Sequence, residues 1–243
     1  MKARGELART AARGFGQTMI TVGLVLILFV VYEVWITTEV TQGRQSELTQ
    51  DLRQSWETGD DPLVGTDPSE PGIAGLPLGE GFAFIRIPRF GPDFVRMILE
   101  GTDEQKLSEG PGHYPGSALP GEVGNFALAG HRVGRGAPFG DLDQLQQGDA
   151  IVIETSDSWF VYRTLDDAAA DIPGRRIVDP GAVEVVEPVP GQPGVAPTRS
   201  LLTLTTCHPR FSNAQRLIVH AELAEPPWSK RGHPDGPPAL AAG

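Results

Sequence analysis

Between residues 82 and 224, short runs rich in β-branched and aromatic residues alternate with turn-forming residues. Each run has the length of a strand, and only two short stretches, around 103–107 and 139–145, have a composition compatible with a helix. Because closure removes the exposed edges of a sheet, we predict a mainly β fold with a closed or nearly closed barrel. The runs are FAFIRI (82–87), FVRMIL (94–99), NFALAG (125–130), AIVIET (150–155), WFVYRT (159–164), LLTLTT (201–206) and RLIVHAEL (216–223).

The N-terminal region has the pattern of a membrane anchor. Residues 19–36, MITVGLVLILFVVYEVWI, are apolar except for Thr21 and Glu33, and as a helix they would be about 27 Å long, close to the hydrocarbon thickness of a bilayer. Basic residues dominate before the run and acidic residues after it, so we predict a cytoplasmic segment at 1–18 and an extracytoplasmic remainder. The alternative is a cleaved signal peptide, but the run is longer than a usual signal core and no small-x-small site follows it.

The segments that flank the predicted barrel differ from it in composition. Residues 37–81 begin with a stretch compatible with a short helix, continue as an acidic, Pro/Gly-rich region, and predict an extracytoplasmic linker. Residues 225–243 have the same character and predict a flexible tail. The predicted barrel domain is therefore 82–224. Within it, the proline-rich segment 178–200 predicts a surface excursion with room for one edge strand.

The charge of the chain limits its partners. The net charge is −11, and no basic face follows the N-terminus, which argues against nucleic-acid binding. The acidic residues Asp141, Asp143 and Asp149 are scattered and predict no metal site. We therefore expect no metal and no cofactor.

The chain contains a single cysteine, Cys207, at the end of the run 201–206. Outside the cell one thiol cannot form an internal disulfide, so it is either buried as a small hydrophobic group or kept for its chemistry. If 201–206 and 216–223 are antiparallel neighbours, alternation places Cys207 and Arg216 on the same face. A nearby cation favours the nucleophilic thiolate, and a guanidinium can hold an oxyanion. A buried Cys beside a surface Arg is the alternative.

A cysteine nucleophile also needs a proton donor and acceptor. His131 is the best candidate because it directly follows 125–130, where a strand would deliver its side chain to the barrel rim, as for Cys207. A loop histidine with purely structural contacts is the alternative. The remaining histidines are expected to be structural or solvated: His113, His208, His220 and His233.

Taken together, TLTTC (203–207), the downstream Arg216 and the upstream ALAGHR (127–132) are specific. They resemble the sortases, membrane-anchored cysteine transpeptidases of Gram-positive bacteria. The longer stretches GPGHYPGSALPGEVGNFALAGHRVGRGAPFGDLDQLQQGD and LLTLTTCHPRFSNAQRLIVHAEL are similar to the class E branch of actinobacteria. The likeness covers roughly residues 82–223.

The resemblance implies an eight-stranded sortase barrel and a catalytic set of Cys207, His131 and Arg216. It implies cleavage of an LAxTG-type sorting signal of surface proteins between Thr and Gly, through a thioester, and transfer to an amine of a peptidoglycan precursor. Thr205 and Thr206 are candidate substrate-binding residues beside the nucleophile. The membrane lipid around the anchor is the remaining expected partner.

Some features depart from the family pattern. The segment 164–180 is longer than expected and borders the region of the sortase substrate groove. Neither a second transmembrane segment nor a lid motif points to a pilus polymerase, which favours an anchoring role. The alternatives are another extracytoplasmic cysteine enzyme, such as an L,D-transpeptidase or papain-like hydrolase, and a non-catalytic tethered β-domain with an inert thiol.

Overall fold

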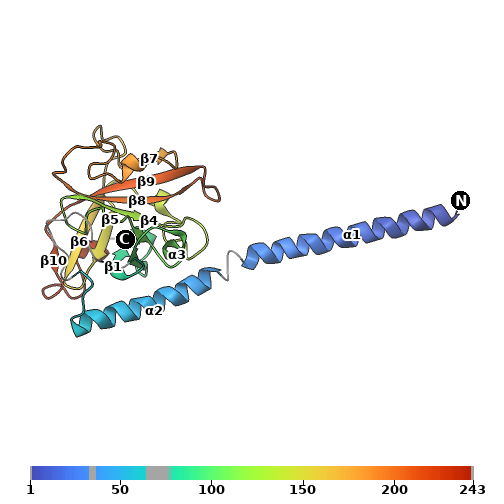
Figure 1. Cartoon of the computed structure of the whole chain (residues 1–243), viewed down its shortest axis with the longest axis horizontal. Coiled ribbons are helices and arrows are strands. Elements are labelled where there is room, and N and C mark those ends of the chain that lie inside the picture. The colour runs from blue at the N-terminus through green and yellow to red at the C-terminus, as the bar shows by residue number, and fades with distance from the viewer. Residues whose placement is uncertain (1, 33–36, 64–75, 77, 242–243) are drawn as a thin grey trace.

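The strands of the catalytic region form one closed barrel. The computed structural model describes residues 2–32, 37–63, 76 and 78–241. The sheet order is β10-β6-β5-β1-β2-β3-β4-β8-β9-β7, and an additional pairing of β6 with β9 closes the eight strands from β6 to β9 in this order into a ring (Figure 1). The predicted mainly β barrel is thereby confirmed. The strands are β1 (Gly81–Arg86), β2 (Val95–Glu100), β3 (Gly112–His113), β4 (Gly124–Ala129), β5 (Ala150–Glu154), β6 (Ser158–Thr164), β7 (Arg175–Val178), β8 (Ser200–His208), β9 (Gln215–Leu223) and β10 (Trp228–Ser229).

Helices are long at the N-terminus and short within the barrel domain. In the part of the chain with described side chains, the apolar stretch Arg13–Val31 of α1 is long enough to cross a membrane, and none of it is buried. The predicted span continues to residue 36, and residues 33–36 lie outside the described part. The short helices expected near 103–107 and 139–145 correspond to α3 and η3. The helices are α1 (Lys2–Val31), α2 (Thr37–Thr58), α3 (Glu104–Leu107), η2 (Pro88–Phe90), η3 (Leu142–Gln144), η4 (Val183–Val185) and η5 (Pro238–Ala241).

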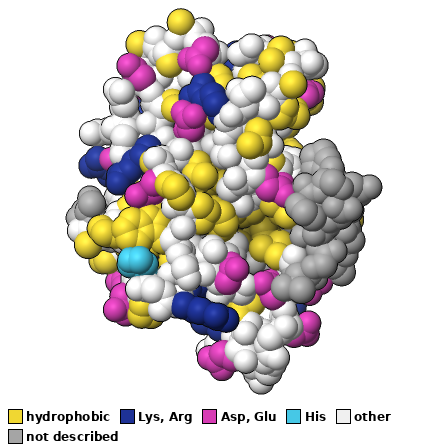
Figure 2. Space-filling model, turned by 90° about the vertical axis from the view of Figure 1, so that its left-hand side faces the viewer, with side chains coloured by type: hydrophobic (Ala, Val, Ile, Leu, Met, Phe, Trp, Pro, Cys, Tyr) yellow, Lys and Arg dark blue, Asp and Glu magenta, His cyan; other side chains and the backbone are white. Residues whose placement is uncertain are grey.

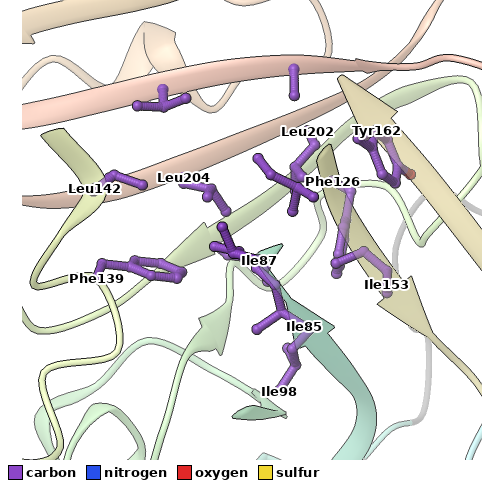
Figure 3. Close-up of a cluster of buried hydrophobic side chains, with 14 of the residues drawn as sticks. Ile85, Ile87, Ile98, Phe126, Phe139, Leu142, Ile153, Tyr162, Leu202 and Leu204 are labelled. Atoms are coloured by element: carbon purple, nitrogen blue, oxygen red, sulfur yellow. The ribbon is translucent and has the colours of Figure 1, made fainter. Parts of the chain in front are cut away.

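The barrel interior is filled by aliphatic and aromatic side chains from every side of the ring. Leu202 and Leu204 of β8 point into the same interior as Ile85 and Phe126, and all four are fully buried (Figure 3). Burial of each such side chain contributes about 1.5–3 kcal/mol. Because strand residues alternate between faces, Cys207 is excluded from this core and lies on the outer face.

The helix α2 packs on the barrel, so residues 37–58 are not the solvated tether that composition predicted. Leu52 is buried against Phe84 and Met97, and Trp56 meets Phe84 edge-on at 5.3 Å between ring centroids. Leu48, Leu52 and Trp56 recur at intervals of four, which is a helical apolar stripe that sequence analysis could have used.

A buried glutamine completes this docking. Gln45 lies in α2, and its Oε1 accepts from the Met97 N–H at 2.9 Å, while its Nε2 donates to the Glu109 carbonyl. The side chain therefore substitutes for a strand partner at the part of β2 that β3 does not reach. The oxygen and the nitrogen of the Gln45 side-chain amide thus hold α2 in register with the sheet.

The C-terminal segment is also packed rather than free, which corrects the predicted flexible tail over its described residues. Trp228 and Ser229 pair with β6, and the Trp159 indole donates to the His233 carbonyl at 3.1 Å. Lys230 forms an ion pair with the buried Glu154 at 3.0 Å. Bulky and charged residues in 225–243 thus find partners that are remote in sequence.

Glu154 connects both flanking segments to the barrel. Besides Lys230, it pairs with Arg86 of β1 at 2.8 Å and Arg53 of α2 at 3.3 Å. Burial acts to raise the pKa of Glu154, but these cations, with Arg86 first, outweigh it and hold the pKa below its ordinary value. One buried carboxylate is therefore shared by α2, β1 and the C-terminal segment.

We predict that Gln45→Met loosens α2 without unfolding the barrel. The substitution keeps the side-chain length but leaves buried backbone groups of β2 unpaired, at about 1–3 kcal/mol. In hydrogen exchange on the full-length chain in detergent, peptides from 43–58 should exchange faster while those from β8 stay protected. Gln50→Met, at an exposed position of α2, is the matched control. Unchanged exchange of 43–58 in Gln45→Met would contradict this role.

Candidate active site

Cys207 and Arg216 are direct cross-strand partners. The antiparallel register of β8 and β9 pairs Cys207 with Arg216 and Thr205 with Ile218. The Arg216 guanidinium donates to the carbonyl oxygens of Asn213 and Gln215, each at 3.0 Å. Among the described residues it forms no ion pair with a carboxylate. Cys207 is a partly exposed free thiol. The structure therefore places Arg216 directly across from the partly exposed Cys207 in the strand register, as alternation predicted.

The parallel pairing of β4 with β8 brings the histidine to the same end of the barrel. Ala129 is the register partner of Thr205, the Gly130 N–H donates to the Thr205 carbonyl at 3.1 Å, and the Thr206 hydroxyl donates to the Gly130 carbonyl at 2.8 Å. Continuing this register by one residue beyond Gly130 puts His131 level with Cys207.

The environment of His131 disfavours its charged form. Burial, and then the positive charge of Arg135, lower the pKa of His131, and Glu104 opposes this with a smaller effect. The imidazole of His131 is therefore harder to protonate than that of an ordinary histidine. Its Nε2 is buried with no hydrogen-bond partner among the described residues, so it remains available to a reacting group.

Arg132 is a site residue that sequence analysis missed. It is 5% exposed, forms an ion pair with Asp143 at 3.0 Å, and donates to the Cys207 carbonyl at 3.3 Å. It also contacts His208 Nδ1 at 2.9 Å. A buried arginine directly after His131 thus ties the backbone of the nucleophile to the histidine segment. The adjacency in GHR was visible, but its contact across the strands was not.

Tyr114 is the second missed residue, and it separates the roles of the two threonines. Its hydroxyl lies 3.0 Å from Thr205 Oγ1, on the outer face that also carries Cys207. Thr206 alternates to the opposite face, and its hydroxyl donates to the Gly130 carbonyl. Of the two threonines, Thr205 therefore shares a face with Cys207, and its hydroxyl also donates to the Leu128 carbonyl at 3.3 Å. Tyr114 was hidden because it precedes Pro115 in an apparent turn.

The geometry can be compared with known proteins. The sortase domain family matches residues 85–224. The sortase SrtE1 of Streptomyces coelicolor is 35% identical over 94% of this chain, and the chain spans 61% of that relative's length. The chain belongs to the sortase family. Sortases are cysteine transpeptidases. The sortase SrtE2 of S. coelicolor is 34% identical over 90% of this chain and 84% of that relative, which places this sortase in class E.

Solved structures agree in fold. The SrtF sortase of Corynebacterium diphtheriae is 43% identical, with a TM-score of 0.65 over 69% of this chain and 95% of that chain. Sortase E1 of S. coelicolor, solved with a tripeptide in its active site, is 35% identical, with a TM-score of 0.57 over 67% of this chain and 97% of that chain.

The remaining histidines of the sortase barrel make structural contacts. His113 is fully buried against Glu100, and His208 meets Arg132. His220 lies buried on β9, with Nδ1 2.9 Å from the Thr203 hydroxyl. Burial lowers the pKa of His220 to about 4, with Arg176 adding to the shift. Within the described residues, no group of three His, Cys, Asp or Glu side chains is arranged to hold a metal ion.

We predict that His220 makes the sortase less stable in acid. Its folded pKa, about 4, is below the ordinary 6.5, so only the unfolded chain takes up this proton as the pH falls from 6.5 towards 4. Between pH 7 and pH 5 this removes about 2 kcal/mol of stability. Urea unfolding followed by tryptophan fluorescence should show a smaller pH-dependent loss for His220→Asn than for the native chain. Equal losses would contradict the assignment.

We also predict that two neighbouring charges move the pKa of His131 in opposite directions. Arg135→Gln removes a cation and should raise it, whereas Glu104→Gln removes an anion and should lower it. Histidine ring signals followed by NMR against pH, assigned with His131→Gln, provide the measurement. Arg163→Gln, on β6, is the charge-matched control. A shift of the same sign in both variants would refute the electrostatic explanation.

Proposed function

We propose that this chain is a membrane-anchored class E sortase that cleaves an LAxTG-type sorting signal between Thr and Gly. The acyl group passes through a thioester on Cys207 to an amine of a peptidoglycan precursor. The observation that carries the proposal is the pairing of β8 with both β4 and β9, which pairs Cys207 with Arg216 and brings the strand end before His131 to the same end of the barrel. Family membership supports the same chemistry.

Acylation follows from the site geometry. Cys207 Sγ attacks the Thr carbonyl carbon, and the uncharged His131 takes the thiol proton as the C–S bond forms. The guanidinium of Arg216, free of carboxylates among the described residues, donates to the developing oxyanion. His131 then gives its proton to the leaving glycine nitrogen as the C–N bond breaks. The product is a Cys207 thioester.

Transfer reverses these proton movements. The acceptor amine attacks the thioester carbonyl, His131 takes the amine proton, and the sulfur of Cys207 leaves and regains a proton. Arg132 does not touch the substrate in this scheme. It holds the Cys207 carbonyl at 3.3 Å and so fixes the strand end from which the sulfur projects.

The sorting signal would bind on the outer face of β4 and β8. Thr205 and Tyr114 lie on the face that carries Cys207, and the small side chains of Ala127 and Ala129 neighbour Thr203 and Thr205 there. The tripeptide in the active site of sortase E1 supports a peptide site in this fold. Thr206 is proposed to support the strand pair rather than to contact substrate.

The apolar N-terminal helix and the surface charge of the barrel are consistent with an enzyme that acts at the extracytoplasmic face of the cell membrane. Arg13–Val31 is proposed to span the bilayer with the basic N-terminus in the cytoplasm and the barrel outside. On the barrel face shown in Figure 2, acidic and basic side chains are interspersed and form no basic patch among the described residues. A nucleic acid therefore has no evident footprint on that face.

The test is the intact mass of the full-length chain in detergent after incubation with an LAxTG peptide, with and without an amine. We expect an acyl adduct on Cys207, none in Cys207→Ala, and an amine-linked product cut between Thr and Gly. Arg216→Ala should slow acylation by about 10²–10³-fold, because an oxyanion donor is lost. Arg163→Ala is its control.

Different outcomes separate the alternatives. Cleavage that gives only the free acid would support the thioester on Cys207 but contradict transfer to an amine. A folded chain that forms no adduct with LAxTG or related peptides would instead favour the tethered β-domain. An adduct that persists in Cys207→Ala would assign the chemistry to another residue.

A further inference from the structure

A chain of buried polar groups lies beside the candidate site and has no part in the reaction scheme above. His113 is fully buried, and its Nδ1 is 2.6 Å from Glu100 Oε2. Its Nε2 is 2.7 Å from Ser117 Oγ and 3.2 Å from the Ala118 carbonyl. Glu100 is itself 3% exposed. We call Glu100, His113 and Ser117 the buried triad.

The surroundings of the buried triad are apolar. The His113 ring lies 5.7 Å from the Phe82 ring and 5.2 Å from the Phe126 ring, both core residues of the barrel. Burying polar groups in such a place is unfavourable unless every one is paired, and a fully paired network holds its members rigidly. In the triad, the two ring nitrogens of His113 are paired, Nδ1 with the Glu100 carboxylate and Nε2 with the Ser117 hydroxyl.

The hydrogen bonds of the buried triad continue into β4. With a proton on Nδ1, His113 donates to Glu100 and accepts from the Ser117 hydroxyl, whose oxygen in turn accepts from the Ala127 N–H at 3.3 Å. The Tyr114 N–H donates to the carbonyl of the same Ala127 at 2.9 Å. Ser117 of the triad thus fastens one side of the 114–117 turn to Ala127 of β4, and the Tyr114 backbone fastens the other side to the same residue.

Tyr114 is the residue that this turn presents to the site. Its backbone is held between His113 and Ser117, and its hydroxyl reaches Thr205 at 3.0 Å, two residues before Cys207 on the same face. Pro115 and Gly116 at the tip of the turn are exposed. Backbone bonds also close this turn, from the Ser117 N–H to the Tyr114 carbonyl at 3.0 Å and from the Ala118 N–H to the Asn125 carbonyl at 3.1 Å. The triad adds side-chain anchoring to that backbone frame.

We propose that His113, through the buried triad, is a positioning residue that sets the Tyr114 hydroxyl against Thr205 and so shapes the peptide groove beside Cys207. The proposal rests on the proposed function, because the groove is where that function binds the sorting signal. His113 acts only through Tyr114 and touches neither substrate nor the reacting atoms. A purely structural histidine would instead affect the barrel without regard to Tyr114.

The test uses the full-length chain in detergent and the acylation rate with an LAxTG peptide. The variants are His113→Gln, Ser117→Ala, Tyr114→Phe and the doubles that combine each of the first two with Tyr114→Phe. Each single variant should lower kcat/KM for acylation by about tenfold, mainly through KM, because misplaced groove residues weaken peptide binding. Each double should lose no more than Tyr114→Phe alone, since the triad acts through that hydroxyl. Losses that multiply would overturn the proposal.

Two controls distinguish positioning from damage to the fold. The rate of Cys207 alkylation by iodoacetamide, which needs no peptide groove, should stay unchanged in Ser117→Ala, and slower alkylation there would assign the triad a general structural role. Ser117→Ala removes one hydroxyl from a half-buried residue. If His113→Gln does not fold, the proposal can still be tested with Ser117→Ala. Ser108→Ala is the matched serine control.

Hydrogen exchange makes the inference testable apart from activity. In Ser117→Ala, peptides that cover 113–118 should exchange faster, while those from β8 keep their protection. Unchanged exchange of 113–118 would overturn the proposal even if the enzyme acylates normally. If the native chain forms no adduct, the proposed function fails, and this exchange result still decides whether the triad positions Tyr114.

Discussion

The parallel pairing of β4 with β8 brings together residues that are far apart in the chain. Parallel neighbours cannot be joined by a tight turn, and here β5, β6, β7 and the excursion up to residue 199 lie between them. The ladder from Gly124 and Ser200 to Ala129 and Thr205 then carries His131 and Cys207 to the same barrel end. Without that pairing, Cys207 and Arg216 would still lie opposite each other on neighbouring strands, but the strand end that precedes His131 would not lie beside them.

The site is polar on the outside of a barrel whose interior is closed and apolar. Alternation along β8 sends Leu202 and Leu204 inward and Thr203, Thr205 and Cys207 outward. The inward residues hold the strand by burial, which allows the outward face to carry groups whose contacts are incomplete. His131 and Arg216 illustrate this, since the first has an unpaired buried nitrogen and the second an uncompensated charge. Such groups are available to a substrate because the fold does not need them for its own stability.

Networks of buried polar groups hold α2 and the C-terminal segment against the barrel, although their composition predicted a linker and a flexible tail. Glu154 draws α2 and the C-terminal segment onto the barrel, and Gln45 places α2 in register with β2. In each case a polar group that would be unfavourable alone is paired by a residue distant in sequence. Net acidity and a high content of proline and glycine are averages over a segment. Such averages do not reveal the few side chains that pack on the barrel. For this reason the packing of α2 and of the described part of 225–243 was not predicted.

The residue order alone was enough for the seven longer strand runs, the short helices near 103–107 and 139–145, the apolar N-terminal helix and the pairing of Cys207 with Arg216, but not for the short strands β3, β7 and β10. These follow from local patterns, namely a period of two, turn residues and a short loop between two runs. The choice of His131 among the histidines also came from a local pattern, its place at a strand end. The tertiary structure decided the contacts of Arg132, Tyr114 and the buried triad, the docking of α2 and the closure by β6 and β9. Those contacts depend on which strands become neighbours, and strand order in a closed sheet is set by the packing of the whole core rather than by any one segment.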